Sequence, residues 1–363
     1  MRITMACVIA GLLLFVFQFS CSGNLTDPNT FKSIEWVESS PEAQGLSSQM
    51  INMGFLAADQ KPFINGIVII RNGYLVAERY FNGHDKHDYH NIRSVSKSFL
   101  SALFGIAIRE NYIPNLAVKI MEYFPEYKDD QMDNRFDQVT LNDLITMHSG
   151  LDTDHNNYGP IFNSGDWIGT TLNQTLIASP GEEFHYTTAG THLLSAILTK
   201  ATGMSSYEFA EKHLLKPMGI SLENWEKGPS GYYIGGNNMH TSPRNLAKFG
   251  QLYLDGGVLN DVEIVPSSWV SASKQDKMHR DNLTWGPLTD MGYGYLWWLG
   301  TIADYEAFIA IGHGGQFIIS IPELQMIITT VSQSYNLTWD QADEQERAVL
   351  HLIDDFIMPA IID

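Results

Sequence analysis

The chain has 363 residues, and 44% of them are hydrophobic, an ordinary content for a globular protein that argues against general disorder. It carries 41 Asp and Glu residues against 22 Lys and Arg residues, so its formal net charge at pH 7 is -19. A surface this acidic repels phosphate backbones, and no nucleic-acid partner is expected.

The chain begins with the pattern of a secretion signal. Arg2 precedes an almost uninterrupted apolar run at residues 3–19, and small residues follow from Ser20. The run is too short and too lightly flanked for a spanning helix, which predicts a signal peptide at residues 1–20. We therefore expect an exported protein, located in a bacterial periplasm or anchored to the outer membrane as a lipoprotein.

The two cysteines, Cys7 and Cys21, bear on how the chain is anchored. Because Cys7 lies inside the predicted signal, the mature chain cannot form an internal disulfide. Cys21 resembles the lipidated cysteine of bacterial lipoproteins, although the residues before it depart from the usual pattern; simple cleavage after Ser22 is the alternative. Residues 21–44 are polar and unpatterned, which predicts a tether, with a lipid anchor at Cys21 as a hypothesis.

A strand hairpin and a buried helix are predicted to open the folded part. Residues 67–71 and 74–81 have strand composition and are separated by Asn72-Gly73, a strong hairpin signal. Residues 94–110 are apolar around most of a helical circumference, which predicts burial. No strand pair is expected between residues 112 and 250, where the patterns predict helices at 141–147, 190–201, 206–215 and 243–254.

Strand patterns return in the last quarter of the chain, at residues 292–298, 307–311, 317–321 and 325–331. A terminal helix at 344–357 directs its apolar positions toward that sheet. The pattern predicts an α+β fold, with an antiparallel sheet built from N- and C-terminal segments, flanked by helices, and a mainly helical insertion. The predicted subdomains are α/β at 45–112 and 255–363, and mainly helical at 113–254.

Ser94 and Lys97 are the first candidates for chemistry. They stand three apart at the start of the predicted helix, so both side chains project from one face. Burial and the positive helix N-terminus lower the pKa of such a lysine, which then can accept the serine proton, and the first backbone N–H groups suit an oxyanion. The same spacing recurs at Ser271 and Lys274, in a polar segment that we interpret as solvated surface.

Two further motifs accompany the first one. Tyr186-Thr187-Thr188 precedes a predicted helix, and Gly312-His313-Gly314-Gly315 lies on a late strand. With these motifs in this order, the sequence resembles the serine β-lactamase and penicillin-binding protein superfamily, in the branch of class C β-lactamase-like esterases, amidases and D-amino-acid peptidases. The resemblance spans about residues 60–335 and also includes segments at 144–151, 241–247 and 293–295.

The resemblance implies that Ser94 is the nucleophile, Lys97 its base, and Tyr186 the phenol that relays a proton to the leaving group. A tyrosine oxygen beside a lysine ammonium can have a pKa below its usual value of about 10, which would ease proton exchange. A core tyrosine with a satisfied hydroxyl is the structural alternative. Thr188 stands where the family usually has asparagine, so substrate choice or rate should differ from the family norm.

His313-Gly314-Gly315 stands where the family often has Lys-Thr-Gly. The resemblance implies that the two glycines let a substrate lie against the strand, and that the backbone N–H of Gln316 joins that of Ser94 in an oxyanion hole. A neutral His313 holds a carboxylate poorly, which favours neutral esters or amides over penicillin-like substrates. A purely structural histidine is the alternative.

Other polar and aromatic groups were weighed as sites. A cluster of five polar residues lacks the usual spacing of zinc ligands and is interpreted as a solvated loop: His84, Asp85, His87, Asp88 and His90. No metal and no cofactor are expected. Tyr158 and Trp167, in a Gly- and Asn-rich loop, are the better candidates for lining an apolar pocket.

The sequence thus predicts a serine hydrolase that cleaves an ester or amide, in a small molecule or short peptide, through an acyl-enzyme on Ser94. One alternative keeps the mechanism but makes the protein a β-lactamase or D-alanyl-D-alanine peptidase, acting on β-lactams or cell-wall peptides. The other is a non-catalytic cell-envelope binding protein of the same fold. The sequence indicates no particular oligomeric state.

Overall fold

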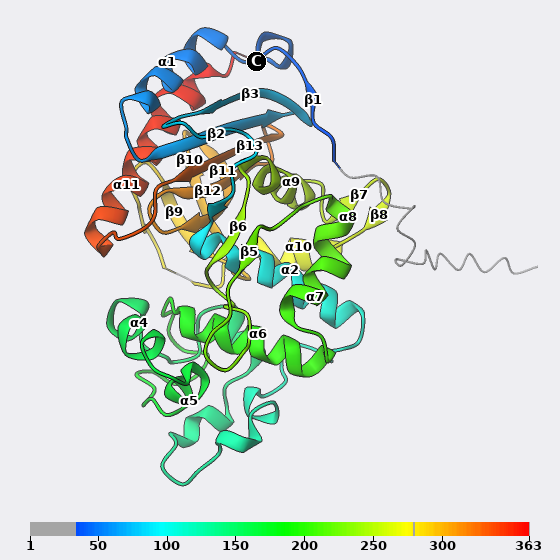
Figure 1. The fold of residues 1–363 in the computed structure, drawn as a ribbon, viewed down its shortest axis with the longest axis vertical. Coiled ribbons are helices and arrows are strands. Elements are labelled where there is room, and N and C mark those ends of the chain that lie inside the picture. Colours follow the sequence, from blue (N-terminus) through cyan, green and yellow to red (C-terminus); the bar gives the residue numbers. More distant parts are fainter. Residues whose placement is uncertain (1–33, 279, 363) are drawn as a thin grey trace, which may run out of the picture.

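The computed structural model describes residues 34–278 and 280–362 (Figure 1). The predicted signal peptide, Cys21 and the first part of the predicted tether lie outside these residues. In the described part of the chain, no helix combines the length and the apolar character needed to cross a bilayer.

One eight-stranded sheet is built from the two ends of the chain, in the order β1-β3-β2-β13-β12-β11-β10-β9. The pairing of β13 with β2 joins the C-terminal strands to the N-terminal hairpin. All neighbours are antiparallel except β1 and β3, which run parallel. This arrangement confirms the predicted fold class. The strands are β1 (Val37–Glu38), β2 (Ile64–Arg71), β3 (Tyr74–Tyr80), β9 (Thr289–Tyr293), β10 (Trp298–Ile302), β11 (Tyr305–Gly312), β12 (Gln316–Ile321) and β13 (Met326–Ser332).

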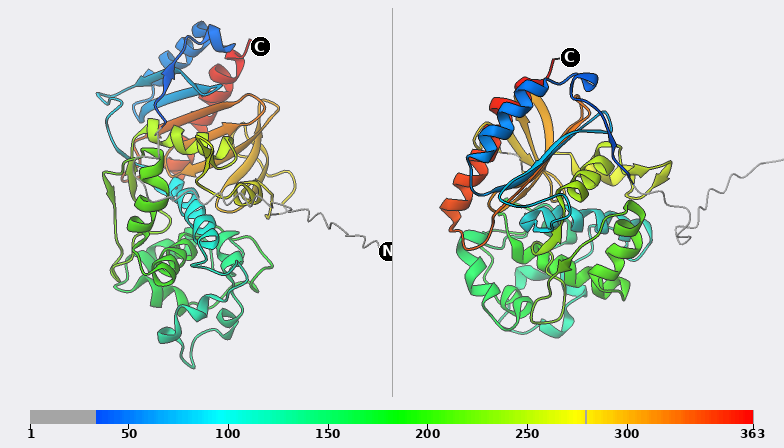
Figure 2. Two further views of the ribbon diagram at one scale, coloured as in Figure 1. Left: turned by 90° about the vertical axis from the view of Figure 1, so that its right-hand side faces the viewer. Right: turned by 45° about the horizontal axis from the view of Figure 1, so that its top comes forward.

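Helices cover both faces of this sheet (Figures 1 and 2). On one face lie α1 (Ser48–Asp59) and α11 (Trp339–Leu352), which continues into a π-helical segment, η7 (Ile353–Ile357). On the other lie α2 (Ser96–Arg109) and α9 (Pro243–Leu254). Because successive strand residues point to opposite faces, β2 contributes to both cores: Ile67 and Ile69 to the first, Val68 and Ile70 to the second.

A mainly helical part follows α2 and lies beyond the end of the sheet in Figure 1. It comprises α3 (Leu141–Ile145), α4 (Asp154–Phe162), α5 (Trp167–Leu172), α6 (Thr188–Thr202), α7 (Ser206–Ala210) and α8 (Lys216–Met218). The remaining elements are β4 (His90–Asn91), β5 (Asn224–Trp225), β6 (Met239–Thr241), β7 (Val258–Leu259), β8 (Val262–Glu263) and α10 (Ser267–Ser273). Helix α9, grouped with the helical part by the sequence, packs on β2, β12 and β13.

Two sequence predictions are wrong in detail. Strands β5 and β6 form a small sheet with β4, although no strand pair was expected there, because strands of two or three residues are too short to show alternation. Residues 292–298 are not one strand but the end of β9, a connection and the start of β10. Leu296 has a φ of 57° in that connection, and its N–H donates to the carbonyl of Ile145 at 3.2 Å.

Candidate functional site

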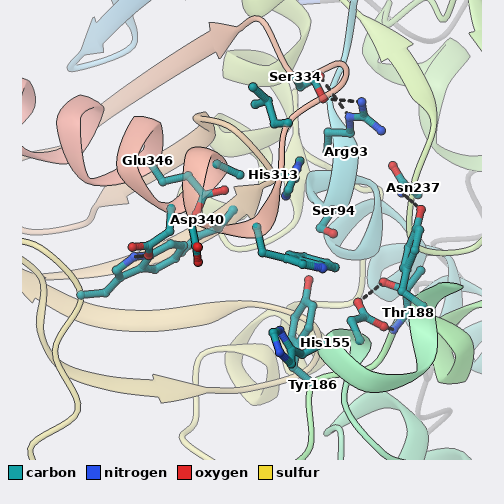
Figure 3. Close-up of a pocket in the computed structure, with 18 of the residues that line it drawn as sticks. Arg93, Ser94, His155, Tyr186, Thr188, Asn237, His313, Ser334, Asp340 and Glu346 are labelled. Carbon is teal, nitrogen blue, oxygen red and sulfur yellow. Dashed lines mark hydrogen bonds between the residues drawn. The ribbon is translucent and has the colours of Figure 1, made fainter.

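The turn η2 (Arg93–Val95) presents Ser94 to a cavity between the sheet and the helical part (Figure 3). Arg93 has a φ of 50°, a left-handed conformation that is strained for a side chain with a Cβ. Its backbone N–H donates to Asn91 Oδ1 at 2.9 Å, and its Nε donates to Ser334 Oγ at 3.0 Å. These contacts hold the turn and therefore the position of the Ser94 hydroxyl.

Lys97 lies in the first turn of α2 with only 1% of its surface exposed. Its Nζ is 2.8 Å from Ser94 Oγ, 2.9 Å from Thr188 Oγ1 and 3.0 Å from the carbonyl oxygen of Gly236. Burial lowers the pKa of Lys97 to about 8, against an opposing effect of the Asp154 charge. A neutral amine that donates to Thr188 and Gly236 keeps its lone pair for the proton of Ser94.

Asp154, which the sequence analysis missed, fixes the direction of these hydrogen bonds. Its Oδ1 accepts the backbone N–H of Thr188 at 2.6 Å, and its Oδ2 accepts the Thr188 hydroxyl at 2.5 Å. Burial raises the pKa of Asp154, yet both of its oxygens accept, as in an ionised carboxylate. Because the Thr188 proton is committed to Asp154, its oxygen is free to accept from Lys97. The only sequence signal was an acidic residue at the start of a helix.

Gly236 brings a backbone carbonyl to the lysine and was also missed. A Cβ atom on this residue would lie 2.2 Å from Thr191 Oγ1 and 3.0 Å from Lys97 Nζ. Only glycine therefore fits between α6 and the lysine without displacement. The sequence signal was the pair Gly235-Gly236 in a polar loop, which by itself indicates only a turn or a close backbone approach.

Tyr186 lies just before α6 and its hydroxyl is directed toward Ser94 (Figure 3). Its ring stacks on Trp298, with ring centroids 5.7 Å apart, and Lys97 Nζ is 4.9 Å from its centroid. Burial raises the pKa of Tyr186 above its ordinary value, so the prediction of a lowered pKa is wrong. The phenol keeps its proton at neutral pH and is suited to donate it.

His313 lies in the turn between β11 and β12 and lines the same cavity. Its ring meets Trp339 edge to face, with centroids 5.2 Å apart. Burial, followed by the nearby charge of Arg93, lowers the pKa of His313, so the ring is neutral at pH 7. The structure thus brings Ser94, Lys97, Tyr186 and His313 to one place.

The neighbouring glycines have backbone conformations and contacts that require glycine. Gly314 and Gly315 have φ values of 83° and 101°, in the left-handed region. A Cβ atom on either residue would face α11 or the segment that leads into it. Neither glycine lines the cavity. Glycine is needed here for the turn and its packing, and a contact of these two residues with a substrate stays a prediction. The Gln316 side chain is buried and donates to the carbonyl of Ser332 at 3.0 Å, while an oxyanion role for its backbone N–H stays a prediction.

The cavity has a volume of about 620 Å³ and receives side chains from both parts of the fold. Tyr158, predicted as a pocket residue, lines it, and its hydroxyl accepts from Asn237 Nδ2 at 3.1 Å. Trp167 does not line it, because its ring packs against Phe162 and His192. The cavity is therefore large enough for a small molecule or a short peptide end.

The second Ser-x-x-Lys copy lies outside this cavity. Ser271 is exposed on α10, and Lys274 Nζ lies 5.0 Å from the centroid of the Phe308 ring. In the loop at residues 84–90, His84 Nδ1 pairs with Asp88 Oδ2 at 2.9 Å. Within residues 34–278 and 280–362, no group of three or more His, Cys, Asp or Glu side chains is arranged to hold a metal ion.

The Lys97 geometry predicts a pH profile. Because the base must be neutral, kcat/KM for an activated ester should rise with pH and level off above a midpoint near the Lys97 pKa of about 8. Removing the Asp154 charge in Asp154→Asn removes an effect that raises this pKa, so the midpoint should move to lower pH. Asp152→Asn, whose carboxylate contacts Asn156 instead, should leave the midpoint in place; equal shifts in both variants would contradict the assignment.

These features define the β-lactamase/transpeptidase-like class of protein. They are a sheet assembled from both chain ends, a helical insertion, and a serine, a lysine and a tyrosine at their junction. The chain belongs to the beta-lactamase family, whose sequence profile matches residues 64–352. It is 24% identical over 294 residues to the 6-aminohexanoate-dimer hydrolase of Paenarthrobacter ureafaciens, covering 74% of this chain and 72% of that protein.

Solved structures agree with the fold. EstCE1, a hydrolase with promiscuous acyltransferase activity, superposes with a TM-score of 0.67 at 15% identity, over 86% of this chain and all 100% of that one. The D-amino acid amidase of Ochrobactrum anthropi SV3 superposes with a TM-score of 0.64 at 14% identity, over 85% of this chain and 99% of that one. Similarity at this level shows the fold, and the family membership with its named relatives supports the prediction of a hydrolase.

Proposed function

We propose that the protein is a serine hydrolase that cleaves an ester or amide through an acyl-enzyme on Ser94. The observation that carries this proposal is the 2.8 Å contact between Lys97 Nζ and Ser94 Oγ, at an amine whose other two acceptors are fixed. A buried amine with a lowered pKa beside a hydroxyl is the arrangement that activates a serine nucleophile.

The residues divide the reaction as follows. Lys97 takes the proton of Ser94 as Oγ bonds to the substrate carbonyl carbon, and the carbonyl oxygen becomes an oxyanion near the Ser94 backbone N–H. Tyr186 gives its proton to the leaving group as that bond breaks, and recovers one from the Lys97 ammonium. Water then attacks the acyl carbon, losing a proton to the same pair, and the carboxylic acid leaves while Ser94 regains its hydrogen.

Covalent labelling tests the nucleophile. A fluorophosphonate should add one adduct to the wild-type protein, measured by intact mass, and none to Ser94→Ala, because only an activated serine displaces fluoride. The matched control is Ser271→Ala in the second Ser-x-x-Lys copy, which should be labelled like the wild type. An unlabelled wild-type protein would instead support the non-catalytic binding protein.

The neutral His313 favours neutral esters and amides over β-lactams, which carry a carboxylate. A p-nitrophenyl ester should therefore be turned over faster than a chromogenic cephalosporin by the same preparation.

We also propose that the protein is exported and anchored through a lipid on Cys21. The apolar run at residues 3–19 and the small residues after it support this location.

A further inference from the structure

One face of α11 forms an acidic wall of the cavity. Asp340, Asp343 and Glu346 are spaced three residues apart, so they share a face of the helix, and all three line the cavity together with Trp339. In Figure 3, Glu346 and Asp340 lie on the other side of His313 from Ser94. None of the proposed catalytic steps uses these carboxylates.

Glu346 is the member whose surroundings point to a ligand. Its side chain is only 6% exposed, and its Oε1 accepts the Gly314 N–H at 2.7 Å. Its Oε2 has no hydrogen-bond partner among the described residues, although the side chain lines the cavity. Burial raises the pKa of Glu346 to about 8, and the Asp343 charge acts in the same direction. A cation placed in the cavity would stabilise the ionised carboxylate.

The neighbours of Glu346 indicate what kind of cation fits. Asp343 is already paired, since its oxygens accept from Arg347 Nε at 2.8 Å and Trp285 Nε1 at 2.7 Å. Glu346 and Asp340 therefore remain to receive a charge. The indole rings of Trp285, Trp298 and Trp339 also line the cavity, and aromatic faces attract ammonium groups. The described acids are not clustered as metal ligands, which favours an organic cation.

We propose that this acidic and aromatic wall is a subsite for a primary ammonium group, so that the natural substrates are esters or amides that carry an amine. The assignment of substrate class rests on the proposed function, because the amine is carried by the acyl group that is transferred to Ser94. Binding of the ammonium group itself does not depend on catalysis and is tested separately.

Calorimetry on the Ser94→Ala protein, which cannot form an acyl-enzyme, measures this binding directly. Butylammonium should bind at least about tenfold more tightly than 1-butanol, the neutral probe of similar shape. Glu346→Gln should abolish most of this preference, because glutamine keeps an acceptor for the Gly314 N–H but has no charge. The matched control is Glu344→Gln on the same helix, where an exposed acid outside the cavity is neutralised and the preference should be unchanged.

A thermal melt checks that each variant folds, and Asp340→Asn takes the place of Glu346→Gln if that variant does not. Equal affinity for the two probes, or a preference that survives in the folded variant, would overturn the subsite.

In the wild type, a series of ω-aminoacyl p-nitroanilides of increasing length is compared with methyl-terminated counterparts. At one length or more the amine should raise kcat/KM; a preference for methyl at every length also overturns it. If no compound, including neutral esters, is hydrolysed, the proposed function fails instead.

Discussion

Lys97→Met should lower kcat/KM for a neutral activated ester by about 10³-fold, because it removes the base that accepts the Ser94 proton. Methionine is unbranched and fills most of the space of the buried lysine side chain, so the fold should survive. The Tyr186 phenol that remains beside the site has a raised pKa, which makes it a poor base at neutral pH. Steady-state kinetics at a pH above the midpoint, with a thermal melt for folding, measure this effect.

The chain supplies its own control for this experiment. Lys274→Met changes the lysine of the second Ser-x-x-Lys copy, which faces Phe308 rather than the cavity, and should leave kcat/KM unchanged. A folded Lys97→Met protein with wild-type activity would show that another group deprotonates Ser94. Equal losses in both variants would indicate a general effect of removing a lysine and not a base at residue 97.

Gly236→Ala should lower kcat by about 10²-fold, although residue 236 contributes only a backbone carbonyl. The new Cβ would lie 2.2 Å from Thr191 Oγ1 and 3.0 Å from Lys97 Nζ, so the loop or the lysine must move. The amine would then lose its alignment with Ser94 Oγ. Overpacking of this kind should also destabilise the fold by about 1–3 kcal/mol, which denaturant titration can measure.

Gly165→Ala is the matched control, because residue 165 is exposed, has no neighbour within 4 Å of its Cβ position, and is not in the left-handed region. It should retain wild-type kcat and stability. If Gly236→Ala were equally active, the carbonyl of residue 236 would not be needed to hold the lysine. Loss of stability without loss of kcat would assign Gly236 a packing role alone.

Local patterns in the sequence were sufficient for the main elements and for four of the site residues. Asn72-Gly73 marks the hairpin, and the periodicities of residues 94–110 and 317–331 survive as α2, β12 and β13. Ser94 and Lys97 could be paired in advance because helical spacing alone brings them to one face. The choice between the two Ser-x-x-Lys copies needed the accompanying motifs, which are also local.

The partners of Lys97 depended on contacts between segments far apart in the chain. Asp154 begins α4 and Gly236 lies in a loop after α6, and no spacing rule relates them to α2. The rise in the pKa of Tyr186 likewise depends on burial against Trp298, which a neighbouring lysine in the motif did not reveal. The sequence also did not show that α11 packs on Gly314 and Gly315.

By itself, the sequence determined the hairpin β2–β3, the helices α2, α6 and α9, the strands β11, β12 and β13, the order of the motifs, and the serine and lysine that one helical turn places together. Only the tertiary structure decided which carboxylate and which carbonyl hold that lysine, which protonation state Tyr186 keeps, and that an acidic face of α11 closes the cavity. The physical reason is range: backbone hydrogen bonds and side-chain periodicity act within a few residues, whereas desolvation and electrostatic pairing depend on groups that meet only after folding.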